Sequence, residues 1–189
     1  MSASLFKIGA GRRAKTKLSD EAAAADAGDG KKKKTAAMMR MMGDMQELDL
    51  PDNCKLILPN KDDLMRFSIS VKPDAGYWKG ATYTFSFEIS DHYPYKAPKV
   101  KCLEKIWHPN IDLNGAVCLN ILRESWRPVL NIQNVVHGLI FLMLDPNPND
   151  PLNQEAAEVM RNDLTRFQQM VAQSLRGGYV QGTQFPRNM

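Results

Sequence analysis

The sequence is organised around residues 107–122, which read Trp107-His108-Pro109-Asn110-Ile111-Asp112-Leu113-Asn114-Gly115-Ala116-Val117-Cys118-Leu119-Asn120-Ile121-Leu122. Pro109 and the pair Asn114-Gly115 favour turns, so the first part of the stretch is expected to be an irregular loop. The residues around Cys118 open a short apolar run. Cys118 therefore stands where a loop meets packed structure, which is a suitable support for a reactive side chain.

Cys118 is a candidate nucleophile, because cysteine attacks acyl groups readily near neutral pH. A hydrolase would pair the thiol with a histidine base, and the chain has three histidines, His92, His108 and His137. His108 precedes a proline among apolar residues and is expected to be a turn histidine bonded to backbone. Without a strong base nearby, a thioester on Cys118 would survive until an amine arrives. The Asn110 amide would then stabilise the oxyanion, so the residues favour acyl transfer to an amine over hydrolysis.

Two structural interpretations of these residues stay open at this point. A cysteine between valine and leucine is most often a buried small hydrophobe, and Asn110 is also typical of a turn. Cys102, His108 and Cys118 could instead bind zinc. The chain has no CxxC pair and no evident fourth ligand, so no metal site is predicted.

Upstream of this stretch the sequence first predicts a helix. Apolar residues recur at helical spacing across residues 38–48, and Pro51 ends the pattern. We expect the apolar side to pack on a sheet. The exposed side would carry three charged residues, Arg40, Asp44 and Glu47.

Four predicted strands follow the helix. Each is a run rich in β-branched, aromatic or aliphatic residues, and inward and outward positions alternate in the longer two. The links between them are short and contain turn signals, which implies an antiparallel meander. The predicted strands span residues 55–58, 64–71, 81–89 and 100–103.

Helices are predicted again after residue 122. Asn131 can cap an apolar helix that runs to Met143, and Asn153 can begin another. A last helix over 164–175 ends at Gly177-Gly178. Helices at both ends of an antiparallel sheet make an α+β domain. The sequence has neither GxGxxG nor a phosphate loop, so no nucleotide cofactor is expected.

The motifs together resemble one family, the ubiquitin-conjugating enzymes. His108-Pro109-Asn110 followed by Gly115 to Leu119 is similar to the active-site signature of that family. Three further motifs match the family in order and spacing: Tyr93-Pro94, Trp126 with Pro128, and residues 145–152. The resemblance runs from about Thr35 to the C-terminus, and it implies the ubiquitin-conjugating fold with Cys118 as nucleophile.

Within the family, the chain resembles the branch that conjugates the Nedd-type (Rub) ubiquitin-like protein. Three segments suggest this branch: 118–124, 152–157 and 176–179. Asn120 stands where most relatives that carry ubiquitin have aspartate. Conjugation of ubiquitin itself is the alternative, and a variant of the fold that has lost acyl transfer is disfavoured because Cys118 and Asn110 are both present.

The resemblance implies roles for further residues. Asp150 matches an acidic residue near the thioester that would orient the incoming lysine, and Leu152 would pack beside the thioester. Expected partners are a Nedd-type modifier, its heterodimeric activating enzyme, a RING ligase and a cullin substrate. The surface that faces the ligase would comprise Arg40, Tyr95, Pro128 and Val129.

The first 34 residues form a separate basic extension before a catalytic domain at 35–189. They carry nine Lys/Arg and four Asp/Glu, a net charge of +5, whereas the whole chain is at +4. Their Ala, Gly and Lys content predicts disorder. Leu5, Phe6 and Ile8 are the exception, and the resemblance implies that they dock on the activating enzyme.

Composition narrows the location and the partners. The sequence shows no apolar run of membrane-spanning length and no secretory leader, so no membrane association is expected. Three cysteines without paired spacing fit a reducing compartment, the cytoplasm and nucleus. Lys31 to Lys34 could contact nucleic acid, but the domain shows no basic stripe with interleaved aromatics, so nucleic acid is an unlikely partner.

Overall fold

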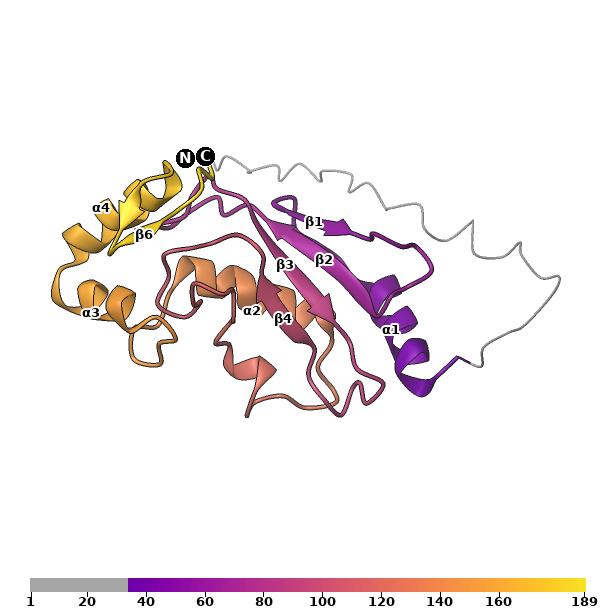
Figure 1. Ribbon diagram of the computed structural model, residues 1–189. Coiled ribbons are helices and arrows are strands. Elements are labelled where there is room, and N and C mark those ends of the chain that lie inside the picture. The colour runs from indigo at the N-terminus through magenta and orange to yellow at the C-terminus, as the bar shows by residue number, and fades with distance from the viewer. Residues whose placement is uncertain (1–33) are drawn as a thin grey trace, which may run out of the picture. The chain divides into compact units, whose positions relative to one another are not determined.

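The computed structural model describes residues 34–189, and this part of the chain begins with a helix and a sheet (Figure 1). Helix α1 spans Ala36–Glu47, and the Thr35 side chain caps it by accepting a hydrogen bond from the Met38 amide. Four strands follow in the antiparallel order β1-β2-β3-β4, as the meander predicts. They are β1 Cys54–Ile57, β2 Arg66–Val71, β3 Tyr83–Glu88 and β4 Lys99–Cys102.

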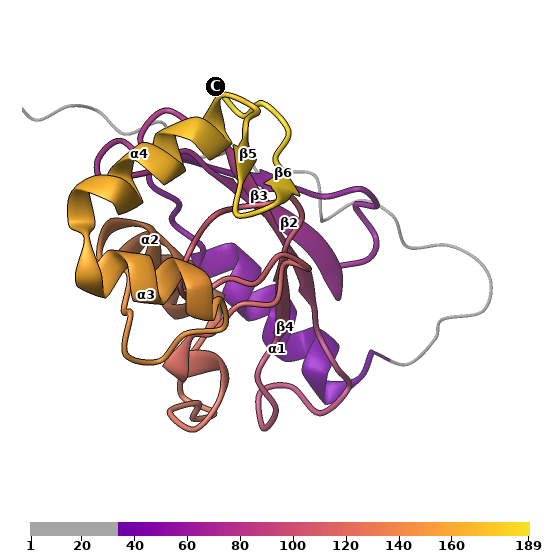
Figure 2. The ribbon, with the colours of Figure 1, turned by 60° about the vertical axis from the view of Figure 1, so that its left-hand side comes forward.

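The remaining helices follow the irregular segment after β4. A single 3-10 turn, η1, spans Asn120–Leu122 and leads to α2, which spans Ile132–Leu144. Asn131 caps α2 through a capping box with Asn134. Helix α3 (Gln154–Asn162) and helix α4 (Leu164–Leu175) lie together, away from α1 (Figures 1 and 2). A small hairpin, β5 Tyr179–Val180 with β6 Thr183–Gln184, packs by α4 and was not predicted.

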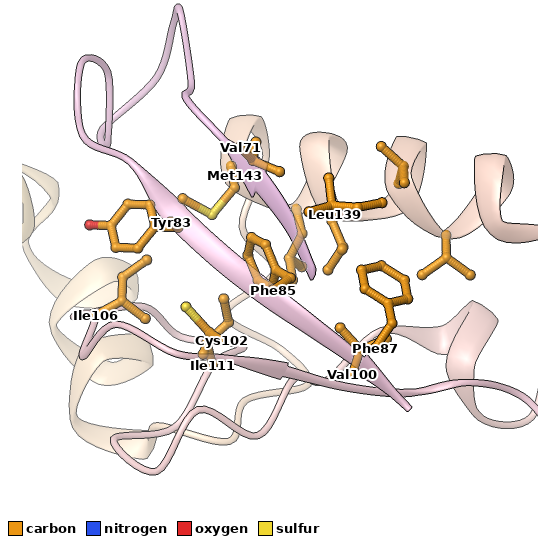
Figure 3. Close-up of a cluster of buried hydrophobic side chains, with 14 of the residues drawn as sticks. Val71, Tyr83, Phe85, Phe87, Val100, Cys102, Ile106, Ile111, Leu139 and Met143 are labelled. Carbon is orange, nitrogen blue, oxygen red and sulfur yellow. The ribbon is translucent and has the colours of Figure 1, made fainter. Parts of the chain in front are cut away.

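The core lies between α2 and one face of the sheet (Figure 3). In β2 and β3 every second side chain points inward, and Phe67 stacks on its cross-strand partner Phe87 with 4.8 Å between ring centres. Leu139 and Met143 of α2 point toward these strands and are buried. Burial of such side chains stabilises the fold by about 1.5–3 kcal/mol each, so the alternation seen in the sequence sets which face α2 covers.

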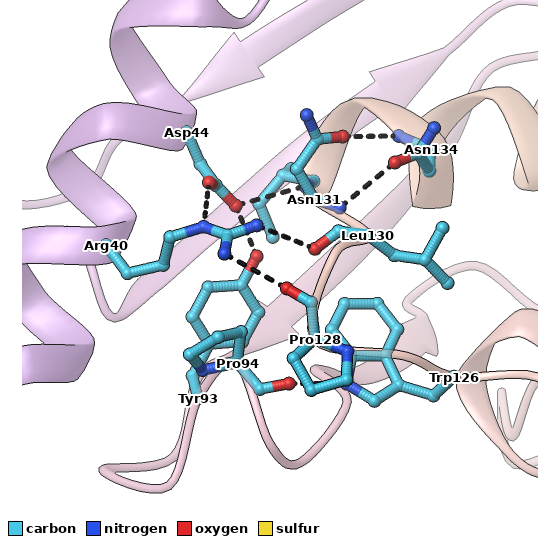
Figure 4. Close-up of polar contacts among 10 residues, drawn as sticks. Arg40, Asp44, Tyr93, Pro94, Trp126, Pro128, Leu130, Asn131 and Asn134 are labelled. Atoms are coloured by element: carbon cyan, nitrogen blue, oxygen red, sulfur yellow. Dashed lines mark hydrogen bonds and ion pairs between the residues drawn. The ribbon is translucent and has the colours of Figure 1, made fainter.

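Asp44 corrects the prediction for α1. It was expected on the exposed side, but it is 5% exposed. Its carboxylate accepts hydrogen bonds from Arg40 Nε at 2.7 Å, from the Tyr93 hydroxyl and from the Ile132 amide at 3.3 Å (Figure 4). All three donors satisfy a charge that burial would otherwise disfavour. Two of them come from distant parts of the chain, so helical spacing alone could not reveal this buried site.

Gly115 determines how the irregular segment packs against β4. Its φ is +82°, and a Cβ at this position would overlap the Cys102 carbonyl oxygen. The close approach allows the Cys102 amide to donate to the Gly115 carbonyl at 2.9 Å. Only glycine combines this backbone conformation with this contact, and the segment that carries Cys118 is thereby held on the sheet.

Within residues 34–189, no helix is both long enough and apolar enough to cross a membrane.

Candidate active site

Cys118 lies at the end of the segment that folds back on itself after β4. Its amide donates to the Asn110 carbonyl at 2.8 Å, and a bridge between Ile111 and Val117 closes the loop. The side chain is 6% exposed, with its sulfur beneath two charged side chains. The loop thus holds the thiol just below these two side chains, at the junction of loop and packed structure that the sequence predicted.

His108 is confirmed as a turn histidine bonded to backbone. It is fully buried, stacks on Trp78, and has its Nε2 3.1 Å from the Leu142 carbonyl. Its Nδ1 accepts from the Asn110 amide at 2.8 Å, so Nε2 carries the proton and donates to Leu142. Burial lowers the pKa of this imidazole to about 3. His108 is therefore neutral and structural, with no part in activating Cys118.

Asn110 ties the cysteine loop to the loop that follows α2. Its Nδ2 donates to the Asn147 carbonyl at 2.7 Å and to the Asp150 carbonyl at 2.9 Å. Its Oδ1 accepts from the Asn147 amide at 2.8 Å. Both side-chain hydrogens are thus engaged and the residue is almost completely buried. In this state Asn110 fixes the position of Asp150, and its role as an oxyanion donor stays a prediction.

Asp150 and Arg123 meet the sulfur of Cys118 directly. The thiol donates to Asp150 Oδ2 at 3.1 Å, and Arg123 Nη2 lies 2.6 Å from the sulfur. The same Nη2 is 2.6 Å from Asp150 Oδ2. The structure therefore brings together the three predicted catalytic residues, Cys118, Asn110 and Asp150, and adds Arg123.

Arg123 is the residue that the sequence reasoning missed. A basic residue five positions after the cysteine was visible within the family motif, but nothing in the pattern placed it at the sulfur. The turn η1 reverses the chain, with the Arg123 amide donating to the Asn120 carbonyl at 3.0 Å. That local fold brings the guanidinium back over Cys118, and periodicity of apolar residues carries no signal for it.

Burial and charge set the protonation of the site. Burial and, after it, the hydrogen bond to Asp150 raise the pKa of the Cys118 thiol to about 11, although the Arg123 charge opposes both. Hydrogen bonds from Cys118 and Arg123 hold the pKa of the Asp150 carboxyl below its usual range. At neutral pH the sulfur therefore keeps its proton while the carboxylate is ionised.

This arrangement suits exchange of an activated acyl group. None of the three histidines, all within the described residues, hydrogen-bonds with Cys118. Cleaving an unactivated amide with a thiol requires a general base of that kind. Receiving an acyl group that is already a thioester does not, because one thiol simply replaces another.

Residues 34–189 contain no group of three or more His, Cys, Asp or Glu side chains able to hold a metal ion. Cys54 and Cys102 are buried free thiols, as expected for structural cysteines. Burial raises the pKa of Cys54 to about 11 and that of Cys102 to about 12. Neither shares the contacts of Cys118.

Comparison with known families assigns the chain. The sequence model of the family described as "Ubiquitin-conjugating enzyme" matches residues 40–175. The chain belongs to the ubiquitin-conjugating enzyme family. The four-stranded meander and four helices of residues 34–189 are the fold of that family, as the sequence predicted.

Several relatives within this family are named NEDD8-conjugating enzymes. The chain is 52% identical over 157 residues to "NEDD8-conjugating enzyme Ubc12" of Arabidopsis thaliana, which covers 82% of this chain and 85% of that protein. It is 47% identical over 158 residues to "Nedd8-conjugating enzyme UbcE2M" of Drosophila melanogaster, covering 84% and 87%. The solved structure of S. cerevisiae Ubc12 matches with a TM-score of 0.76 and 40% identity, covering 82% of this chain and 87% of that one.

In this conjugating enzyme, the residues predicted to face a ligase lie on two neighbouring loops. Tyr95 and Val129 are 81% and 83% exposed, and Pro128 is exposed beside Val129. Trp126 joins the loops by donating from Nε1 to the Pro94 carbonyl at 2.7 Å (Figure 4). Exposed aromatic and aliphatic side chains at one site are typical of an interface.

Arg40 has a different place from the other three. It is half-buried, and its guanidinium donates to the Pro128 carbonyl at 3.0 Å and the Leu130 carbonyl at 2.9 Å. It also pairs with Asp44 and lies over the Tyr93 ring, 5.8 Å from its centre. Arg40 therefore supports the loop that presents Pro128 and Val129, with its donors turned toward the protein.

Proposed function

We propose that this enzyme conjugates a NEDD8-type modifier to lysine. The main support is the Cys118 thiol, which contacts Asp150 and Arg123 and has no histidine base. The chain's relatives named NEDD8-conjugating enzymes support the choice of modifier. Such a thiol is suited to hold an acyl group as a thioester that water does not quickly hydrolyse. A lysine amine, a stronger nucleophile than water, then takes the acyl group.

Two half-reactions make up the proposed cycle. In charging, the Cys118 sulfur attacks the thioester carbonyl presented by the activating enzyme; a new C–S bond forms and the donor thiolate leaves. In discharge, the lysine nitrogen attacks the carbonyl on Cys118, a C–N bond forms as the C–S bond breaks, the sulfur leaves as thiolate, and the amine gives up a proton to solvent. Asp150 would accept a hydrogen bond from the incoming amine, a role supported by its being ionised and half-exposed at the sulfur.

The partners of the cycle are proposals of the same kind. The modifier would come from a heterodimeric activating enzyme that consumes ATP, and the acceptor would be a cullin. Tyr95, Pro128 and Val129 would contact a RING ligase, since they form an exposed patch on two joined loops. Arg40 would act there by holding the loop through the Pro128 and Leu130 carbonyls.

The identity of the modifier can be tested by mass spectrometry of the intact protein. After incubation with ATP, a NEDD8-type modifier and its activating enzyme, we expect one adduct of the modifier's mass that a thiol reagent removes. A parallel incubation with ubiquitin and the ubiquitin-activating enzyme should give far less adduct at equal concentrations. Faster or more complete charging with ubiquitin would contradict the proposal and make this a ubiquitin carrier.

A separate prediction concerns Leu5, Phe6 and Ile8, which lie outside the residues that the structure describes. The sequence suggests that they dock in an apolar groove of the activating enzyme. Leu5→Ala combined with Phe6→Ala should raise the apparent KM for this protein in charging, with kcat little changed. Two buried apolar anchors are worth about 1–3 kcal/mol, so the increase should be roughly 5- to 150-fold.

The control for this titration uses the basic part of the same extension. A variant with Lys31 to Lys34 replaced by glutamine should have a smaller effect that fades as salt rises, since exposed charges are screened. Deleting residues 1–30 should also raise the apparent KM in charging, and the double-alanine variant should reproduce most of that loss. A double-alanine variant with unchanged KM would show that the extension is a plain linker.

A further inference from the structure

Arg123 occupies a position that a surface ion pair alone does not explain. Its Nη2 is within 2.6 Å of two acceptors at once, the Cys118 sulfur and Asp150 Oδ2. The arginine and the aspartate are about half-exposed, with side chains at 49% and 52%, whereas the cysteine between them is buried. A cation therefore rests on the one sulfur that the proposed cycle uses.

The charges around this sulfur oppose one another. Asp150 stabilises the protonated thiol by accepting its hydrogen bond, and it would repel a thiolate. Arg123 stabilises a thiolate and neutralises Asp150 at the same time, because both lie on the same nitrogen. Glu124 also acts on Arg123, and His108, whose Nδ1 accepts from the Asn110 amide, is neutral. Arg123 is thus the cation that can favour ionisation of Cys118.

We propose that Arg123 is a catalytic residue whose guanidinium stabilises the Cys118 sulfur whenever that sulfur carries negative charge. The inference deepens the proposed function and rests on it. In charging, the proton of the thiol passes to solvent and the thiolate that attacks lies against Arg123. In discharge, the lysine nitrogen forms a C–N bond and gives up a proton to solvent. The C–S bond breaks and its electron pair returns to the sulfur, which again lies against Arg123. One cation thereby serves both the attacking and the leaving thiolate.

Alkylation of the free enzyme tests this role without any modifier. Iodoacetamide reacts with the thiolate, so its rate at Cys118 follows the fraction ionised. The sites of reaction can be separated by mass spectrometry of the peptides that contain Cys54, Cys102 and Cys118. Rates would be measured from pH 7 to pH 10 in the full chain and its variants, with circular dichroism to show that each is folded.

The sign of the expected shift follows from the charges. Arg123 favours the thiolate, so Arg123→Gln should raise the pKa of Cys118. At any pH below that pKa the thiolate fraction then falls, and alkylation should slow by roughly three- to tenfold, since one pKa unit corresponds to a factor of ten. Arg123→Lys should restore most of the rate because it returns a cation. Asp150→Asn should change the rate in the opposite direction, because a repelling carboxylate is lost.

Arg127→Gln is the matched control, since Arg127 is exposed in the same segment and donates only to the Glu124 and Trp126 carbonyls among the residues that the structure describes. Its rates should equal those of the unmodified chain. An unchanged rate in Arg123→Gln would reduce Arg123 to a surface ion pair, and a faster rate would show that it merely covers the sulfur. Either result overturns the proposal.

A charging assay then separates this inference from the proposed function. Arg123→Gln should lower the second-order charging rate by about the same factor as the alkylation rate. Slowed alkylation together with no charging of any variant, including the unmodified chain, would leave the role of Arg123 in ionisation standing and contradict the proposed function. Normal charging of the unmodified chain, together with unchanged alkylation in Arg123→Gln, would support the proposed function and contradict the role of Arg123.

Discussion

Cys118→Ser is expected to abolish every adduct that a thiol reagent can cleave. A serine hydroxyl in place of the sulfur would form an oxygen ester, which a reducing agent does not break. Alkoxide is also a much poorer leaving group than thiolate, so the ester should persist when lysine is added. Transfer to substrate should fall below detection, because lysine cannot readily displace the alkoxide.

The site predicts that this variant remains folded. Serine is smaller than cysteine, and its hydroxyl can keep the hydrogen bond to Asp150 Oδ2 that the thiol makes at 3.1 Å. The backbone bond from residue 118 to the Asn110 carbonyl does not depend on the side chain. The midpoint of thermal unfolding should therefore shift little, so a loss of transfer can be attributed to the missing thiol and not to unfolding.

Cys102→Ser is the matched control for Cys118→Ser. Cys102 is buried, its sulfur contacts the Glu104 carbonyl at 3.3 Å, and burial raises the pKa of its thiol to about 12. Such a thiol is almost never ionised and should take no acyl group. The measurement compares adducts on gels with and without reducing agent. A reducible adduct that persists in Cys118→Ser and disappears in Cys102→Ser would show that the nucleophile was misassigned.

The fold could be read from the sequence because its strongest signals are local. Alternating Phe67, Ile69 and Val71 define a strand with one buried side, and Asn131 marks the start of the central helix. The strands were placed within two residues of their observed bounds. The C-terminal hairpin β5-β6 was missed because strands of two residues have no period to detect.

The site was predictable only as far as residues gather within one motif. Cys118 and Asn110 lie in a single loop, and the family resemblance added Asp150. Two features escaped because they depend on contacts between distant parts of the chain or on a reversal of the backbone. The buried Asp44 carboxylate accepts hydrogen bonds from two other segments. Arg123 reaches the sulfur because η1 turns the chain back.

Asn110→Ala is expected to separate the two half-reactions. Discharge of the thioester to free lysine should slow by roughly one to three orders of magnitude, as for the loss of an oxyanion donor. The charging rate should stay close to that of the unmodified chain, because charging exchanges one thiol for another and involves no attack by lysine. Single-turnover discharge of purified thioester, measured beside initial charging rates, gives both numbers.

The structure adds a second reason for the loss, and the charging rate distinguishes the two. Asn110 Nδ2 holds the Asp150 carbonyl at 2.9 Å, so alanine also frees the loop that carries the acidic side chain. Asn110→Asp removes the donors while keeping an acceptor for the Asn147 amide. Asn114→Ala, at an exposed position in the same loop, is the control and should discharge normally. If Asn110→Ala slows charging as much as discharge, the loop has collapsed and the separate role of Asn110 in lysine attack is wrong. If both rates are unchanged, Asn110 is a turn residue alone.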